Sequence, residues 1–130
     1  MLRIGRHVGV AMFHYFNVQD ELTIGDFTTV AGRDPIFHAH YLDATSGAQC
    51  TRPIHIGEYC MLGAAVRFAP GASVPNCCVV GMGSVVTKPF TEPYCLLGGN
   101  PAGILRRLPD DAAYFHRKVG WIGSSTASPW

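Results

Sequence analysis

Large apolar residues recur at every sixth position along the middle of this chain. The unbroken row consists of Ile56, Leu62, Phe68, Val74, Val80 and Val86. A second row of small or apolar residues stands two positions earlier, running from Ile54 to Ser84. A period of six fits neither an α-helix nor one long strand, so each unit is predicted to be a short strand followed by a corner.

The upstream half repeats this period in two shorter blocks. One block is Ile4, Val10 and Phe16, and the other is Ile24, Val30 and Ile36. The step from Phe16 to Ile24 is eight residues and the step from Ile36 to Ile56 is twenty, each two more than a multiple of six. At the second step we expect the two extra residues to leave the coil, so that residues 37–53 form a protruding loop.

Three such units close a triangular coil, and successive coils stack as parallel strands about 4.8 Å apart. The large residue of each unit then points into the prism, and glycine or a small residue turns the corner. The predicted fold is therefore an all-β parallel β-helix over residues 1–108. Cys60 and Cys78 are eighteen residues apart and should stack in adjacent coils as small core residues rather than as a redox or metal site.

The pattern stops at Pro89, and residues 109–130 are predicted to form a C-terminal helix and tail. Asp110 is expected to cap a short helix that runs through Ala112–Phe115 toward Gly120, because aspartate is a favourable N-cap. The segment from Ser124 to Trp130 is expected to be loosely ordered.

Composition narrows the class of protein. The 130 residues are 48% apolar and 15% charged, which indicates one folded domain. A formal charge of +1 provides no broad field for nucleic acid or an anionic membrane. No apolar run is long enough to span a membrane and no signal-like block opens the chain, so a cytoplasmic location is expected. Five cysteines without a Cys-x-x-Cys pair indicate reduced thiols.

Several motifs follow one another in a specific order. They are Pro53–Ala64, Pro70-Gly71, Val80–Lys88 and Gly99–Ala102. Over residues 2–108 the chain resembles the hexapeptide-repeat acyltransferases, which include galactoside, maltose, serine and capsule-type O-acetyltransferases. The resemblance implies a left-handed β-helix, a homotrimer, and acetyl-CoA bound in the groove between two neighbouring β-helices. A short prism also leaves apolar surface that a partner subunit would cover.

Histidine suits the general base that acyl transfer to a hydroxyl requires. The segment His40–Asp43 matches the His-x-x-Asp motif of capsule-type members, so the resemblance implies that His40 is the base. His38 would face the same side of an extended segment and is assigned to the acceptor site, and the choice between the two histidines rests on the motif. Asp43 could orient His40, bind the acceptor or cap a turn. The resemblance also places Asp20, and less strongly Asn17, beside the acceptor.

For the donor, the resemblance maps contacts onto five residues: Ala64, Met82, Thr87, Lys88 and Arg106. Backbone N–H groups of Ala64 and Met82 would hold the pantetheine arm, while Lys88 and Arg106 suit phosphates by their charge. Met82 replaces the small residue usual between two glycines and would narrow the groove.

The predicted activity is acetyl transfer from acetyl-CoA to a hydroxyl group, with a sugar of a polysaccharide precursor as the favoured acceptor and without a metal. One alternative is a metal-dependent lyase of the γ-carbonic-anhydrase kind, which needs three histidine ligands, two of them at a four-residue gap on neighbouring hexads. His38, His40 and His55 do not show that gap. Another alternative is a noncatalytic or truncated scaffold, because Met1 opens almost directly inside a coil.

Overall fold

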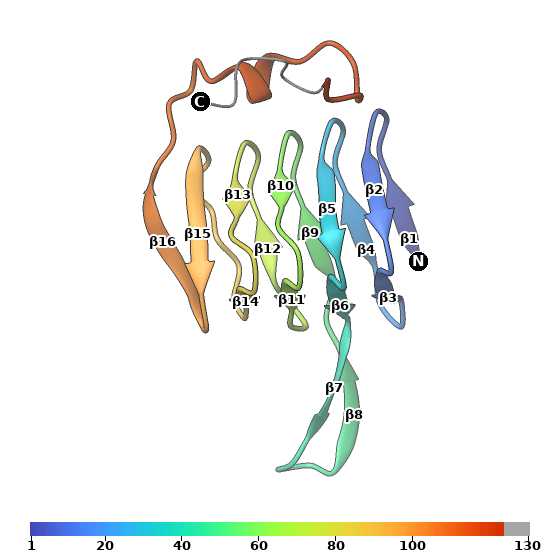
Figure 1. The fold of residues 1–130 in the computed structure, drawn as a ribbon. Helices are drawn as coiled ribbons and strands as arrows, with labels where there is room; N and C mark the ends of the chain where they lie inside the picture. The colour runs from blue at the N-terminus through green and yellow to red at the C-terminus, as the bar shows by residue number, and fades with distance from the viewer. Residues whose placement is uncertain (124–130) are drawn as a thin grey trace.

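The chain folds into about five stacked coils with three flat faces, as the computed structural model in Figure 1 shows for residues 1–123. Face 1 consists of β1 (Leu2–Ile4), β4 (Leu22–Ile24), β9 (Ile54–Ile56) and β12 (Ser73–Val74). Face 2 consists of β2 (Gly9–Met12), β5 (Thr29–Arg33), β10 (Met61–Leu62), β13 (Val79–Val80), β15 (Cys95–Gly99) and β16 (Ala102–Arg107). Face 3 consists of β3 (Tyr15–Asn17), β6 (Ile36–His38), β11 (Arg67–Phe68) and β14 (Val85–Val86).

All strand pairs within the three faces are parallel except the last. β16 turns back and pairs antiparallel with β15, so it covers the edge of face 2 at the C-terminal end. The predicted parallel β-helix of hexapeptide repeats is confirmed.

The core is formed by inward columns of apolar side chains, one column for each face. Face 2, for example, contributes Val30, Leu62, Val80 and Leu97, all fully buried. Cys60 and Cys78 stack behind this column and are also fully buried, which confirms them as core residues. Burial raises the pKa of Cys60 to about 12 and that of Cys78 to about 11, so both thiols stay protonated at neutral pH.

The aromatic column of face 3 corrects the expected register. Phe16, Phe37 and Phe68 stack ring on ring, with centroids 5.0 and 4.8 Å apart. Phe37 is fully buried, whereas Ile36 is only half-buried, so the expectation that Ile36 points inward was wrong. The corner before β6 contains one residue more than a regular unit because Gly32 and Asp34 both adopt positive φ values, which shifts the strand by one position.

The first coil is less covered than the others. Its inward residues Ile4 and Val10 are 46% and 42% exposed, because β1, β2 and β3 are the edge strands of the three faces at this end. The well-packed core therefore begins with the second coil.

A β-hairpin interrupts the solenoid between faces 3 and 1. β7 (His40–Asp43) and β8 (Ala48–Thr51) pair antiparallel only with each other and project away from the coils in Figure 1. The expected excess of two residues was wrong: nearly the whole segment between Ala39 and Arg52 leaves the coil, while Phe37 stays in the core.

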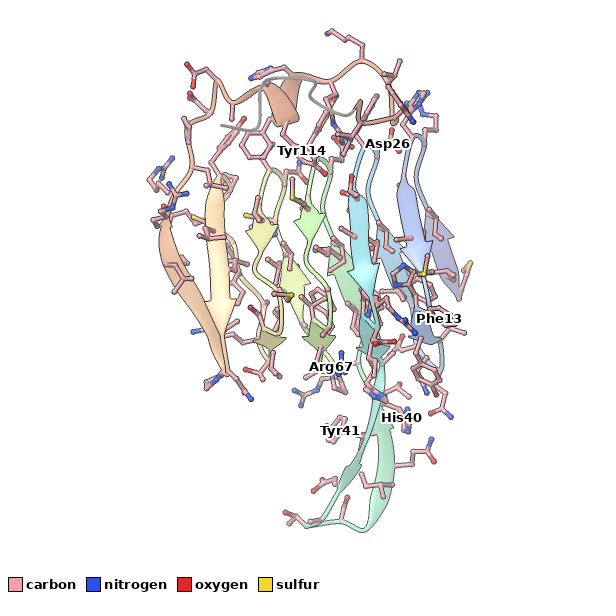
Figure 2. All side chains as sticks on the ribbon, viewed as in Figure 1. Phe13, Asp26, His40, Tyr41, Arg67 and Tyr114 are labelled. Carbon is pink, nitrogen blue, oxygen red and sulfur yellow. The ribbon has the colours of Figure 1, made fainter. Side chains whose placement is uncertain are left out.

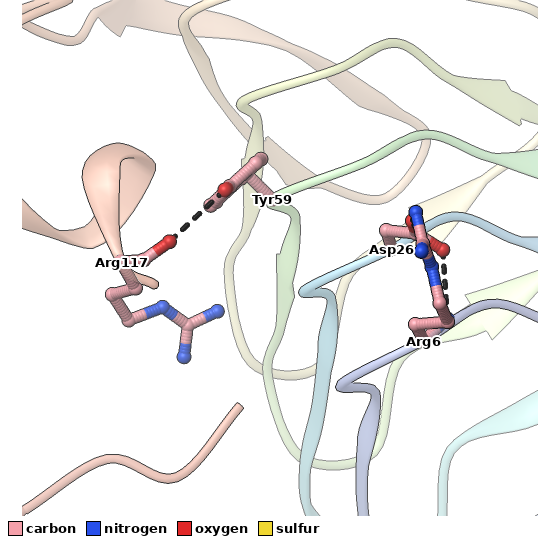
Figure 3. A network of polar contacts seen from close by, with 4 residues as sticks. All are labelled: Arg6, Asp26, Tyr59 and Arg117. Carbon is pink, nitrogen blue, oxygen red and sulfur yellow. Dashed lines mark hydrogen bonds and ion pairs between the residues drawn. The ribbon is translucent and has the colours of Figure 1, made fainter. Parts of the chain in front are cut away.

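Residues 109–123, here called the C-terminal strap, run back across the coils along the corner between faces 1 and 2 (Figure 1). At this corner the rings of His7, Phe27 and Tyr59 stack at centroid distances of 4.7 Å, and all three residues have positive φ values. The Tyr59 hydroxyl donates to the Arg117 carbonyl at 3.0 Å (Figure 3). The Arg117 guanidinium donates to the Phe27 carbonyl. The strap therefore ties several coils together.

The predicted C-terminal helix is a single 3-10 turn, η1 (Ala113–His116), which is the only helix in the described part of the chain. Ala112 occupies the N-cap position without a side-chain hydrogen bond, so the expected Asp110 cap was wrong. The helix ends after one turn because Arg117 is extended, while Tyr114 and Phe115 already pack on the solenoid. The expected loose order of Ser124–Trp130 concerns residues outside the described range.

Candidate active site

Outward side chains of face 3 form a row beside its corner with face 1. The strand register aligns Phe16 with Phe37, Phe37 with Phe68, and Phe68 with Val86. The next residue of each strand or its extension is therefore aligned as well: Asn17, His38, Ala69 and Thr87. Neighbours in such a row lie about 4.8 Å apart, so residues distant in sequence meet at one corner.

The two histidines lie where the hairpin leaves this row. His38 is exposed, and its ring centroid lies 6.2 Å from that of His40 and 5.6 Å from that of Tyr15. His40 is half-buried at the base of the hairpin, as Figure 2 shows. Its Nδ1 is buried without a hydrogen-bond partner among residues 1–123. Nε2 is consequently the ring nitrogen of His40 that solvent or a substrate can reach.

Asp20 and Asn17 lie at the same corner. Asp20 Oδ1 accepts a 2.7 Å hydrogen bond from the Glu21 N–H, which is the main reason that the pKa of Asp20 lies below its usual range. A further hydrogen bond from Thr51, the cross-strand neighbour of His40, also lowers this pKa. The carboxylate of Asp20 is therefore ionised and contacts the base of the hairpin through Thr51. Asn17 is paired with His38 in the strand register, and the His38 ring lies near that of His40.

Asp43 stands apart from this group, at the tip of the hairpin. Its Oδ1 accepts a 2.8 Å hydrogen bond from the Thr45 N–H, and its Oδ2 accepts a 3.0 Å bond from the Ser46 hydroxyl. These bonds lower the pKa of Asp43. No hydrogen bond joins Asp43 to His40 in the described chain, so Asp43 serves the turn rather than orienting the imidazole.

Ala64 and Met82 lie side by side at the opposite corner of face 3, next to face 2. A Cβ placed on Gly63 would lie 2.7 Å from the Met82 nitrogen, so the two coils meet closely here. The neighbouring N–H groups, which belong to Gly63, Ala65, Gly81 and Gly83, each donate to a main-chain carbonyl at 2.8 to 2.9 Å. The N–H groups of Ala64 and Met82 have no such acceptor within residues 1–123, so they are available to a ligand.

The two cationic candidates, Lys88 and Arg106, are both exposed. Lys88 extends over the Phe90 ring, with Nζ 5.3 Å from its centroid, and lines a cavity of about 330 Å³ together with Thr91 and Ile104. Arg106 lies on β16 opposite Leu96 and does not line this cavity.

Three polar residues that join the hairpin to the first coil escaped the sequence analysis: Gln19, Gln49 and Thr51. Gln49 Nε2 donates to Gln19 Oε1 at 2.7 Å. The available signal was the turn-forming run Thr45–Gly47, because a hairpin centred there puts Gln49 and Thr51 on the same side as His40.

Two absences apply to residues 1–123. No three or more His, Cys, Asp or Glu side chains gather into a group that could hold a metal ion. No helix in this range has the length and apolar character needed to cross a membrane.

No protein-family model matches the chain. A relative from Staphylococcus aureus, provisionally named as an acetyltransferase, is 31% identical over 114 residues, which cover 85% of this chain and 57% of the relative. The galactoside O-acetyltransferase of Escherichia coli is 28% identical over 127 residues, covering 92% and 62% of the two chains. Among solved structures, a hexapeptide-repeat acetyltransferase from Vibrio cholerae in complex with acetyl coenzyme A has a TM-score of 0.75 and 32% identity, covering 84% and 61%. The chain spans about three fifths of the length of these relatives.

Proposed function

We propose that this chain, whose fold and sequence resemble those of the hexapeptide-repeat acetyltransferases, is an acetyl-CoA-dependent O-acetyltransferase with His40 as its general base. The observation that carries the proposal is the layout of face 3. At one corner the N–H groups of Ala64 and Met82 have no main-chain acceptor within residues 1–123. At the other corner His38 pairs with Asn17, and its ring centroid lies 6.2 Å from that of His40. A thioester held along this face would meet an acceptor at the hairpin base.

The residues at the hairpin base would divide the work of the transfer. His40 Nε2 takes the proton of the acceptor hydroxyl as its oxygen bonds to the acetyl carbon, and the same nitrogen then returns the proton to the departing sulfur. Asp20 stays ionised and, with Asn17 and His38, holds the other hydroxyl groups of the acceptor. Neutral hydrogen-bonding groups around one carboxylate suit a sugar, and we propose a saccharide acceptor.

The donor-binding residues follow from the same layout. Acetyl-CoA supplies an activated thioester and several amide carbonyls that the Ala64 and Met82 N–H groups could bind. Lys88, Thr87 and Arg106 are exposed toward solvent and would contact the nucleotide half, where positive charge favours phosphates. The exposed Met82 side chain, 77% accessible, would narrow the path of the pantetheine arm.

We also propose a homotrimer in the cytoplasm. Ile104 and Leu105, on β16 at one edge of face 2, are 47% and 62% exposed, and Trp121, beside β2 at the other edge, is 77% exposed. Partner subunits would cover apolar side chains of this kind. Sedimentation equilibrium measures this directly: a single species of three times the chain mass is expected, and a monomer at all concentrations contradicts the trimer.

A thiol-release assay with acetyl-CoA and a panel of sugars tests the activity. We expect release with at least one sugar and a loss of about 10² to 10⁴ in kcat for His40→Ala, the range of general-base catalysis. A smaller loss is expected for His38→Ala, which removes only an acceptor contact. A loss below about tenfold for His40→Ala contradicts its role as base, and no release with any acceptor contradicts the proposed function.

A further inference from the structure

The hairpin that carries His40 has few contacts to fix its position. β7 and β8 form a separate two-stranded sheet that extends away from the solenoid (Figure 1). An isolated two-stranded hairpin is at best marginally stable in water. The angle at which the hairpin leaves the prism, and hence the place of the His40 ring, must therefore be set by contacts between the hairpin and the coils.

Strand alternation decides which side chains share a side of the hairpin. The register pairs His40 with Thr51 and Leu42 with Gln49, so these four side chains face one way. Tyr41 and Arg52 face the other way, with the Arg52 guanidinium 5.4 Å from the Tyr41 ring centroid. The His40 side of the hairpin thus differs from its opposite side in both chemistry and contacts.

Each side is tied to a different coil. On the His40 side, Gln49 Nε2 donates to Gln19 Oε1 at 2.7 Å, and Gln19 belongs to the corner of the first coil that also holds Asn17 and Asp20. On the opposite side, Arg52 lies against the third coil, where its Cδ is 3.2 Å from a Cβ placed on Gly71. The Gln19–Gln49 bond links residues thirty positions apart, and the hydrogen bond from Thr51 to Asp20 joins β8 to the same corner.

We propose that Gln19 and Gln49 form a clasp that positions the His40-bearing hairpin against the acceptor corner. The expected effect of the clasp on acetyl transfer rests on the proposed function, whereas its effect on the position of the hairpin does not. With the clasp closed, the β8 strand beside His40 is held at the corner of Asn17 and Asp20, where Thr51, the cross-strand neighbour of His40, bonds to Asp20. With the clasp open, the hairpin can change its angle to the coils and displace the His40 ring. A displacement of about 1 Å at the reacting groups can lower the rate about 10²-fold.

Two measurements on the full chain test the clasp. Hydrogen exchange of the β7 and β8 amides reports the hairpin itself, and kcat and KM for acetyl transfer report the site. Gln49→Ala and Gln19→Ala should each speed hairpin exchange and lower kcat by about tenfold to 10²-fold, with the KM for acetyl-CoA unchanged. The double variant should be no worse than either single variant because both remove the same bond.

Leu42→Ala is the matched control. Leu42 lies directly opposite Gln49, is 76% exposed and belongs to the same side of the hairpin, so its loss should leave exchange and kcat at wild-type values. The charged pair Gln19→Glu with Gln49→Lys should restore both readouts, because it replaces the hydrogen bond by an ion pair across the same gap.

The outcomes separate the two proposals. If hairpin exchange and kcat are unchanged in both single variants, or if the losses of the two single variants add, the clasp is wrong. If the wild-type protein transfers no acetyl group while exchange speeds up as expected, the proposed function fails and the clasp stands as a structural device. If Leu42→Ala matches the glutamine variants, the effect belongs to the hairpin surface and the clasp is refuted.

Discussion

Removing one oxygen atom from the C-terminal strap should weaken the whole solenoid. The Tyr114 hydroxyl lies 2.7 Å from the Cys60 carbonyl and 2.9 Å from the Thr29 hydroxyl, in a part-buried position where desolvation raises the pKa of the phenol. Tyr114→Phe keeps the ring and removes these hydrogen bonds. In a solenoid each coil otherwise touches only its neighbours, so contacts that the strap makes across several coils add cooperativity.

The magnitude follows from the partners that remain. A hydrogen bond contributes about 0.5 to 1.5 kcal/mol net. The Cys60 carbonyl still accepts the Thr29 N–H at 2.8 Å, so it is not left unpaired. We therefore expect Tyr114→Phe to lower the free energy of unfolding by about 1.5 kcal/mol, which for a chain of this size corresponds to a Tm lower by about 6 °C.

Urea unfolding at a fixed protein concentration measures the change, because assembly would make the stability concentration-dependent. Tyr15→Phe is the matched control: Tyr15 is 51% exposed, and its hydroxyl makes no hydrogen bond within residues 1–123. The reasoning is refuted if Tyr114→Phe unfolds within about 0.3 kcal/mol of wild type, or if Tyr15→Phe is equally destabilised.

Three further predictions concern the core and its titrating groups. Phe37→Ala should lower stability by about 3 to 5 kcal/mol and Ile36→Ala by less than half of that in urea unfolding, whereas equal losses would contradict the register in which Phe37 points inward. Burial, opposed by the charge of Asp34, lowers the pKa of His14, so the folded state binds this proton less readily than the unfolded chain. Stability should then be full above about pH 6.5 and fall as the pH drops toward the folded-state pKa, and a His14→Gln variant that keeps the same slope would exclude this cause. Labelling of the native protein with a thiol reagent at pH 8, mapped by mass spectrometry, should spare Cys60 and Cys78, whose pKa values are raised to about 12 and 11, and label the half-buried Cys50 first.

The sequence predicts which residues stack in the columns of the core better than it predicts where the six-residue period is broken. A six-residue period fixes which residues stack, because every coil repeats the same corners, and it correctly aligned Cys60 with Cys78. The same period cannot predict a one-residue shift in register where two large apolar residues are adjacent in the sequence. Ile36 and Phe37 both suit the core, and the extra corner residue that favours Phe37 depends on the positive φ values of Gly32 and Asp34.

The size of a segment that leaves the coil cannot be predicted from the period, for a related reason. Counting residues between Ile36 and Ile56 gives only a remainder after division by six, so a hairpin and a two-residue loop look alike. The family resemblance predicted His40 and Asp20 as site residues, but the contacts of Gln49 and Thr51 depend on the hairpin register and on the hydrogen bonds that join the hairpin to the first coil. The C-terminal strap was missed because its contacts are single side chains, such as Tyr114 and Arg117, that carry no period.

The two irregular segments lie on different corners of the prism, and this separates stability from activity. The strap follows the corner between faces 1 and 2, whereas the hairpin leaves the corner between faces 3 and 1, and Figure 1 shows them at opposite ends of the strands. Tyr114 hydrogen-bonds to Thr29 at the start of β5 in face 2, and Gln49 hydrogen-bonds to Gln19 in the turn after β3. A stiff core of interlocked columns lies between them and transmits little of a local change that leaves the columns intact. Tyr114→Phe should therefore lower Tm without changing kcat below the transition, and Gln49→Ala should lower kcat without changing Tm, whereas a variant of the core column such as Phe37→Ala should affect both.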